Sequence, residues 1–224
     1  SKKSAVSRKQ SSPPVLEFEG VFEGVRATFR VTCVMGHVFR LDFAEAYRDW
    51  DACDPVELWD APLSRCVTSG AVARSLRESC AEADCLVLFL DCDREGEAIA
   101  FEVVEIAACR RVLRAKFSAV APSDLARAMA NLADPDERLA QAVSARQELD
   151  LRVGVAFTRY MTTRFRNKYA GLDASTLSYG PVQTPALNLV VEREDEIASF
   201  AAEPYWTLEL KGASILAQRS KWTR

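Results

Sequence analysis

Four carboxylates in the stretch LVLFLDCDREGEAIAFEV, residues 86–103, have the residue type and spacing to bind a metal ion. Five apolar residues come first, and acids follow at alternate positions: Asp91, Asp93, Glu95 and Glu97. Carboxylates this close repel one another, so they either take up protons or share a cation. Mg2+ prefers oxygen ligands and often takes only one or two carboxylates from a protein. We therefore predict that these acids bind Mg2+.

The residues around the acids predict a strand, a turn and a helix. An unbroken apolar run from Leu86 to Leu90 is typical of a strand buried on both faces, as in a parallel sheet covered by helices. Asp91 would then lie beyond the carboxyl end of the strand, where ligands of such sheets collect. Gly96 allows a tight turn before a helix expected from Ala98 to about Leu113. Acids in a first helical turn can also merely favour the macrodipole; the strand, the doubled carboxylates and the glycine favour the metal.

The composition is that of an ordinary globular protein, with 49% hydrophobic and 27% charged residues among 224. This length suits one domain and part of a second. No apolar run approaches a membrane span, and the first residues lack an apolar signal core. Seven cysteines without a CxxC pair, and a single histidine, favour reduced intracellular thiols over disulfides or a zinc site.

Charge is segregated along the chain. The net charge of −3 and the pI of 5.4 argue against a nucleic-acid binder when taken globally. Residues 151–172 nevertheless contain no acid before Asp173. The cations and aromatic residues of this tract are Arg152, Phe157, Arg159, Tyr160, Arg164, Phe165, Arg166, Lys168 and Tyr169. Cations neutralise phosphates and rings stack on unpaired bases, so the tract as a whole predicts binding of a single strand. Any one of these residues, taken alone, is better explained as part of a solvated or core-facing helix surface.

The first half of the chain outside the acidic stretch predicts short strands and loops. Residues 1–14 are polar, basic and rich in Ser and Pro, so we expect a disordered tail, and the initial Ser is typical of a processed or incomplete product. Alternating residues from Val15 to Val34 predict a hairpin that turns near Gly24. His37 then stands alone among apolar residues, a position more often occupied by a satisfied core histidine than by a ligand.

The second half predicts three helices. Pro122–Ser123 indicates a helix start with Ser123 as N-cap, and Asp134–Pro135 a stop. A long helix is expected over residues 136–169. Its apolar stripe is interrupted by Arg146 and Asp150, which are one turn apart and can pair. A charged pair in an apolar seam is costly unless satisfied, so it either organises a ligand site or is a half-exposed structural ion pair.

A last helix start is expected where Thr184 precedes Pro185, with Thr184 as N-cap. That places Ser178, Tyr179 and Gln183 in the turn before a helix N-terminus. Backbone N–H groups at such a position favour anions, among them a phosphodiester.

Three motifs together resemble one family. DCDREGE, ARQELDLRVGVAFTRYMT and SYGPVQTPALNLVVERE, in this order, resemble the type IA DNA topoisomerases, most closely eukaryotic topoisomerases III of the beta kind. The resemblance runs from about Val15 to the end. It implies an α/β TOPRIM domain with a central, mostly parallel sheet over residues 15–121, incomplete at its N-terminus. It also implies a mainly helical single-strand DNA-binding region over 122–200 and the start of a β-rich gate domain over 201–224.

The resemblance also implies roles for individual residues. Asp91 and Asp93 become Mg2+ ligands, with Glu95 as the third acid of the cluster. His37 falls in a Gly-His motif beside the site, so Glu95 and His37 are the catalytic candidates. The residues that the resemblance and the helix-start pattern assign to DNA are Arg146, Asp150, Arg152, Arg159, Ser178, Tyr179, Gln183 and Thr184.

Members of this family relax or decatenate DNA: a tyrosine breaks one strand and holds its 5′ phosphate, another strand passes, and the break is resealed. Nothing before Val15 matches the family's first strand, with its glutamate and lysine, and no tyrosine lies in a motif resembling SYPRTE. We therefore expect this polypeptide alone to bind single strands weakly and to cleave nothing, its partners being single-stranded DNA or RNA and the missing gate domains. The resemblance implies a nuclear protein, with the cytoplasm as an alternative location, and no membrane contact.

Two rival interpretations remain. A phosphatase of the haloacid dehalogenase kind also has a strand ending in DxD, but wants Thr or Val where Glu95 stands. A non-catalytic single-strand-binding paralogue would share every feature except the activity.

Overall fold

The computed structural model describes residues 13–169 and 175–202. The chain divides into two compact units, Ser1–Gly180 and Pro181–Arg224. The tail expected over residues 1–14 lies almost wholly outside the described residues, as does most of the expected gate-domain start over 201–224.

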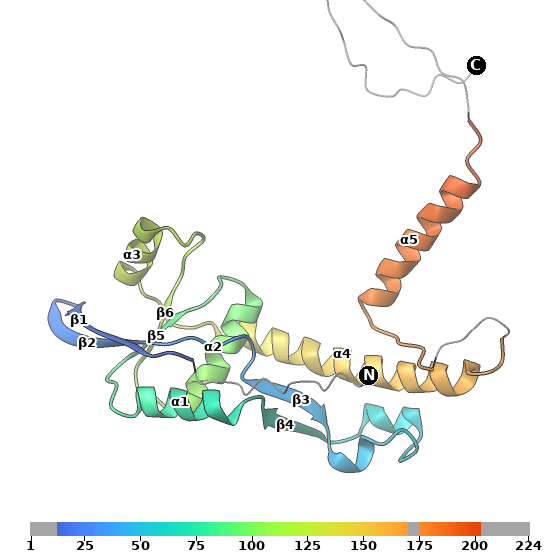
Figure 1. Cartoon of the computed structure of the whole chain (residues 1–224), viewed down its shortest axis with the longest axis horizontal. Helices are drawn as coiled ribbons and strands as arrows, with labels where there is room; N and C mark the ends of the chain where they lie inside the picture. The colour runs from blue at the N-terminus through green and yellow to red at the C-terminus, as the bar shows by residue number, and fades with distance from the viewer. Residues whose placement is uncertain (1–12, 170–174, 203–224) are drawn as a thin grey trace, which may run out of the picture. The chain divides into compact units, whose positions relative to one another are not determined.

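Two antiparallel pairs begin the first unit (Figure 1). Strands β1 (Leu16–Phe22) and β2 (Val25–Val31) form the predicted hairpin. Glu23 and Gly24 turn it with φ angles of 50° and 81°, the left-handed region that glycine enters freely. Strand β3 (Phe39–Phe43) pairs with β4 (Leu63–Val67). The loop between them contains the 3-10 helices η1 (Glu45–Tyr47) and η2 (Pro55–Trp59).

The acidic stretch forms a parallel unit. Strand β5 (Leu86–Phe89) follows helix α1 (Gly70–Cys80), and helix α2 (Arg94–Ala107) crosses over to β6 (Val112–Ala115), which lies parallel to β5. The main core joins apolar side chains of α1, β5 and α2. Leu88 is buried there, but its neighbour Phe89 is exposed. The expectation of a strand buried on both faces is therefore wrong for β5.

The expected central, mostly parallel sheet is not found among the described residues. These residues form three two-stranded sheets, of which only β5–β6 is parallel. Among these residues, β1 pairs only with β2 and β3 only with β4, both antiparallel, and no strand joins either pair to β5–β6. The fold is mixed α/β with small sheets.

Helix α2 begins four residues earlier than the apolar pattern suggested. The Asp93 carboxylate accepts a hydrogen bond of 2.7 Å from Gly96 N and caps the helix. Gly96 is required at this corner, because a Cβ atom there would lie 2.0 Å from the carbonyl oxygen of Asp91. Ala108, with φ of 51°, ends the helix in the left-handed conformation. Residues 112–113 therefore belong to β6.

Helix α3 (Pro122–Ala130) precedes the long helix α4 (Glu137–Phe165). Ala121 is the cap residue of α3 and Pro122 its first residue, so the predicted capping by Ser123 is wrong. Proline at the first helical position needs no N–H partner, which explains the earlier start. Helix α4 is capped by Asp136 and packs along α2 and then η2 (Figure 1).

In the second unit, helix α5 spans Gln183–Ala198, with Val182 as its cap residue. The predicted capping by Thr184 is wrong, because the bond from Ala186 N to Val182 O, at 3.1 Å, already starts the helix there. Pro185 fits inside the first turn, where its missing N–H costs no intrahelical bond.

A buried ion pair connects the elements of the acidic stretch. Arg114, fully buried in β6, donates from Nε to Glu97 Oε1 on α2 at 2.9 Å. The same guanidinium donates to the carbonyl oxygens of Leu88 and Asp91 at 3.2 and 2.6 Å. Glu97 Oε2 accepts from Asp136 N, the cap of α4, at 3.1 Å. One pair thus ties β5, β6, α2 and the start of α4 together.

We predict that Glu97→Ala lowers the free energy of unfolding by about 3 kcal/mol or more, because Arg114 would keep an uncompensated buried charge. Glu105→Ala removes the exposed partner of Arg65 and should cost less than about 1 kcal/mol. Urea unfolding of the two variants measures the difference. Equal, small losses would contradict the structural importance of the Arg114–Glu97 pair.

Candidate active site

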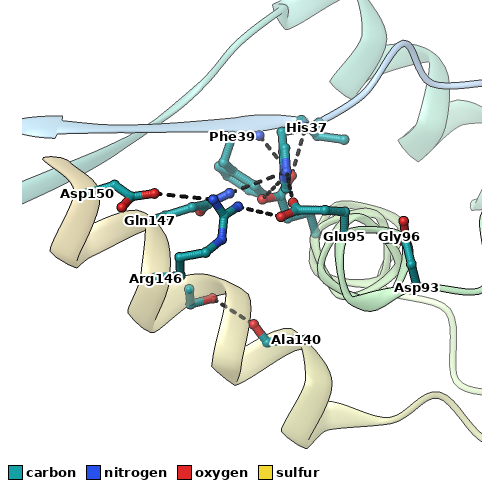
Figure 2. Close-up of polar contacts among 12 residues, drawn as sticks. His37, Phe39, Asp93, Glu95, Gly96, Ala140, Arg146, Gln147 and Asp150 are labelled. Atoms are coloured by element: carbon teal, nitrogen blue, oxygen red, sulfur yellow. Dashed lines mark hydrogen bonds and ion pairs between the residues drawn. The ribbon is translucent and has the colours of Figure 1, made fainter. Parts of the chain in front are cut away.

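Glu95, in the first turn of α2, lies at the centre of a polar cluster. Its carboxylate accepts a hydrogen bond from Arg146 Nη2 on α4 through Oε1. Its other oxygen, Oε2, lies 3.0 Å from His37 Nε2, just before β3. Figure 2 shows the Glu95 side chain between these two cationic groups. Three segments that are distant in sequence therefore meet at one carboxylate.

His37 is held from its other side by Glu102, a residue that sequence reasoning missed. Glu102 Oε1 lies 3.0 Å from His37 Nδ1, and Oε2 accepts backbone N–H bonds from Val38 and Phe39 at 2.7 and 3.2 Å. Its side chain is buried on α2. The available signal was an acid within the apolar run AIAFEVV. Glu102 thereby aims the His37 ring at Glu95.

The pKa of His37 is raised above its ordinary value of 6.5. Partial burial of the ring lowers the pKa, but the hydrogen bonds and negative charges of Glu102 and Glu95 outweigh it. The geometry explains this direction, since only the protonated ring can donate from both nitrogens to both carboxylates. The two carboxylates thus favour the protonated form of His37.

Arg146 and Asp150 pair as their spacing predicted, with Arg146 Nη1 at 3.2 Å from Asp150 Oδ2. About half of the Arg146 side chain is exposed. The neighbouring Gln147 amide nitrogen lies 3.3 Å from His37 Nε2. The pair is therefore part of the Glu95 cluster and keeps a cationic surface that an anion can reach.

Asp91 and Asp93 lie at the carboxyl end of β5, and both are exposed. Figure 2 shows Asp93 across the first turn of α2 from the Glu95 carboxylate. Within the described residues, no three acids, histidines or cysteines are grouped as a metal site. The donor chemistry nevertheless fits Mg2+, because Asp93 uses only Oδ1 in its cap and neither aspartate is in an ion pair among residues 13–169. Asp91 and Asp93 thus offer carboxylate oxygens to a hard cation.

Two arginines assigned to DNA are used inside the protein instead. Arg159 is buried, and its guanidinium donates to the carbonyl oxygens of residues 47, 48 and 49. Arg152 donates from Nη1 to those of residues 58, 59 and 61. Both hold the loop between β3 and β4 against α4, so this placement does not agree with phosphate contacts. The exposed cations near the end of the tract are Arg164, Arg166 and Lys168, and of these Arg166 donates to the carbonyl oxygen of Ser175.

Tyr179 and Ser178 belong to the first unit. Thr158 on α4 holds the Tyr179 main chain, accepting from Tyr179 N at 2.9 Å and donating to Tyr179 O at 3.3 Å. Gln183 and Thr184 belong to the second unit, in the first turn of α5. The DNA contacts predicted for Ser178, Tyr179, Gln183 and Thr184 stay predictions.

Comparisons with known proteins match both regions of the chain. The Toprim domain family matches residues 9–120, and a DNA topoisomerase family matches residues 134–224. DNA topoisomerase 3-beta of Oryza sativa subsp. japonica is 45% identical over 212 residues, covering 91% of this chain and 24% of the relative. DNA topoisomerase 3-beta-1 of Homo sapiens is 44% identical over 209 residues, covering 88% and 24%. The chain thus spans about a quarter of the length of these curated relatives.

A solved structure, full-length topoisomerase I from Thermotoga maritima, matches with a TM-score of 0.52 and 27% sequence identity. The match covers 75% of this chain and 26% of that one. In the described part of the chain, no helix is long and apolar enough to span a membrane.

Because His37 is the only histidine, we predict a single NMR titration with a pKa above 6.5, lowered in both Glu95→Gln and Glu102→Gln. Glu105→Gln, on the same helix without contact to His37, should leave the pKa unchanged. A pKa raised by folding stabilises the fold fully below about pH 6.5, and this contribution disappears as the pH rises through the folded value. A His37 pKa at or below 6.5 would contradict this geometry.

Proposed function

Since this chain belongs to the type IA DNA topoisomerase family, we propose that it supplies the Mg2+-binding acids and part of the single-strand groove of a nuclear topoisomerase III. The complete enzyme would relax or decatenate DNA by transient breakage of one strand and passage of another. No tyrosine of this sequence is assigned as the nucleophile.

The observation that carries the proposal is the contact of Glu95 with Arg146 and His37. Glu95 lies in the region matched by the Toprim family, and Arg146 in the region matched by the DNA topoisomerase family. A phosphodiester at this cluster meets the exposed Arg146 guanidinium, which is suited to phosphate oxygens. The acidic edge and the basic helix therefore support one shared site.

Within this site, the chain's own groups position the phosphate and supply a proton. Arg146 binds a phosphate oxygen and orients the strand along α4. The protonated His37, whose Nε2 lies 3.0 Å from Glu95 Oε2, is proposed to give a proton to the 3′ oxygen that departs when a strand breaks. Return of this proton to the pair accompanies resealing.

Asp91 and Asp93, with Glu95 as third acid, would hold Mg2+, which when bound supplies positive charge that neutralises the scissile phosphate region. Asp150 keeps Arg146 extended toward Glu95. Ser178, in the turn before α5, and Gln183 and Thr184, in its first turn, are also proposed to bind the strand. The nucleic acid is single-stranded DNA, and a matched RNA strand tests the alternative.

We predict that Asp91→Asn with Asp93→Asn abolishes Mg2+ binding, measured by calorimetric titration. Asparagine still caps a helix, so Asp93→Asn removes charge and leaves the start of α2 in place. Glu82→Gln with Asp84→Asn removes the same charge before the other end of β5 and should leave Mg2+ binding intact. An unchanged titration of the first double variant would remove the metal role.

Charge reversal of Arg164 and Lys168 should weaken single-strand DNA binding and reduce the slope of log K against log salt by about 1.4, the value for two lost phosphate contacts. Arg152→Ala and Arg159→Ala should instead lower the melting temperature, because they release the loop between β3 and β4. Titrations over a range of salt concentrations, with melting curves, separate the effects. An unaltered salt slope for the Arg164 and Lys168 variant would exclude these two cations from the DNA surface.

A further inference from the structure

A row of aromatic side chains beside α4 indicates how a bound strand is held. Trp59 of η2, Phe157 of α4 and Tyr179 form a continuous series of ring contacts. The centroids of Trp59 and Phe157 are 6.5 Å apart, and those of Phe157 and Tyr179 are 5.0 Å apart. Trp59 and Phe157 keep 40% and 41% of their surface exposed. Large rings are therefore gathered at the surface.

The rings are fixed through their main chains. Arg152 donates to the carbonyl oxygen of Trp59 at 2.9 Å. Thr158 bonds both the N–H and the carbonyl oxygen of Tyr179. Side chains of α4 thus hold the main chains of both flanking residues without using their rings, which reduces the part of the ordering cost of binding that comes from the main chain.

The angle between the protein's rings suits a ligand with flat, unpaired rings. The planes of Trp59 and Phe157 are inclined by 88°, so the two form a corner. A planar ligand stacked on one ring meets the other edge to face, an arrangement that aromatic pairs favour. Bases of a single strand have such faces, and stacking on aromatic residues is tolerant of sequence.

The row is also continuous with the proposed active site. Phe157 lies eleven residues after Arg146, which is about three turns and 16 Å farther along the same face of α4. No acid lies on α4 after Asp150, and Arg164 is exposed beyond the row. Beyond Asp150, a polyanion that follows this face from Arg146 therefore meets rings and cations and no further carboxylate of the helix.

We propose that Trp59, Phe157 and Tyr179 form a stacking platform for unpaired bases of the strand held at Arg146. This inference rests on the proposed function, and it assigns the platform to base faces, whereas the cations take phosphates. With the platform, affinity depends on whether the strand carries bases, whereas binding by charge alone depends only on its phosphates.

The test compares two strands of equal length and charge, a pyrimidine oligonucleotide and its abasic analogue, each titrated by fluorescence anisotropy against the full 224-residue chain. The wild-type chain should bind the strand with bases more tightly. Phe157→Leu should reduce that affinity about tenfold and leave affinity for the abasic strand unchanged. Tyr179→Leu and Trp59→Leu should act in the same direction, since both keep the main-chain bonds.

Phe18→Leu is the matched control, because Phe18 is an exposed ring on β1, outside this row, and should not alter the preference. Equal wild-type affinity for both strands would overturn the platform and leave the proposed function standing; the rings would then cover another protein segment. Loss of affinity for both strands in Phe157→Leu would also overturn it. Binding of neither strand would overturn the proposed function together with the platform.

Discussion

The buried pair of Arg114 and Glu97 is the constraint on which the rest of the first unit depends. Removing two charges from water is expensive, and such a pair persists only when its remaining donors and acceptors are satisfied. Here the partners are main-chain groups: Arg114 donates to the carbonyl oxygens of Leu88 and Asp91, and Glu97 accepts from Asp136 N. The cost is thereby offset by bonds that fix the end of β5 and the beginning of α4.

This constraint explains why the site lies where it does. The bond to the Asp91 carbonyl holds the main chain at the acidic corner, and Gly96 allows α2 to approach that carbonyl closely. Because Glu97 also anchors the start of α4, the two helices leave one point together. Arg146, about two and a half turns along α4, then reaches Glu95 in the first turn of α2. The contact of Glu95 with Arg146 therefore depends on the main-chain positions that the Arg114–Glu97 pair fixes.

Sequence reasoning found the features that depend on local chemistry. The acidic strand end, the Gly96 corner, the hairpin at Gly24 and the Arg146–Asp150 pair are all set by residue type and short spacing. The contacts it missed are made across long separations. Glu102 pairs with a histidine 65 positions earlier, and Arg114 with a glutamate 17 positions earlier. Neither distance corresponds to a periodic pattern.

The basic tract also shows that contacts across long sequence separations are not predicted by a local pattern. Alternating cations and rings predicted single-strand binding for the tract, but exposure decides which of them can reach a ligand. Arg159 donates its guanidinium to carbonyl oxygens of the loop between β3 and β4, whereas Phe157, two positions away, keeps its ring at the surface. The direction of each side chain depends on what packs against α4, and that information lies in the loop containing Trp59.

The central claim is that the acids after β5 and the cationic face of α4 form one site through Glu95. Paramagnetic relaxation by Mn2+, substituted for Mg2+, tests it most directly, because His37 gives a single set of ring signals. The account predicts strong broadening of the His37 ring and Arg146 side-chain signals, reversed by excess Mg2+ and absent in the Asp91→Asn, Asp93→Asn variant. Sharp His37 and Arg146 signals in the presence of bound Mn2+ would place the metal elsewhere and contradict the account.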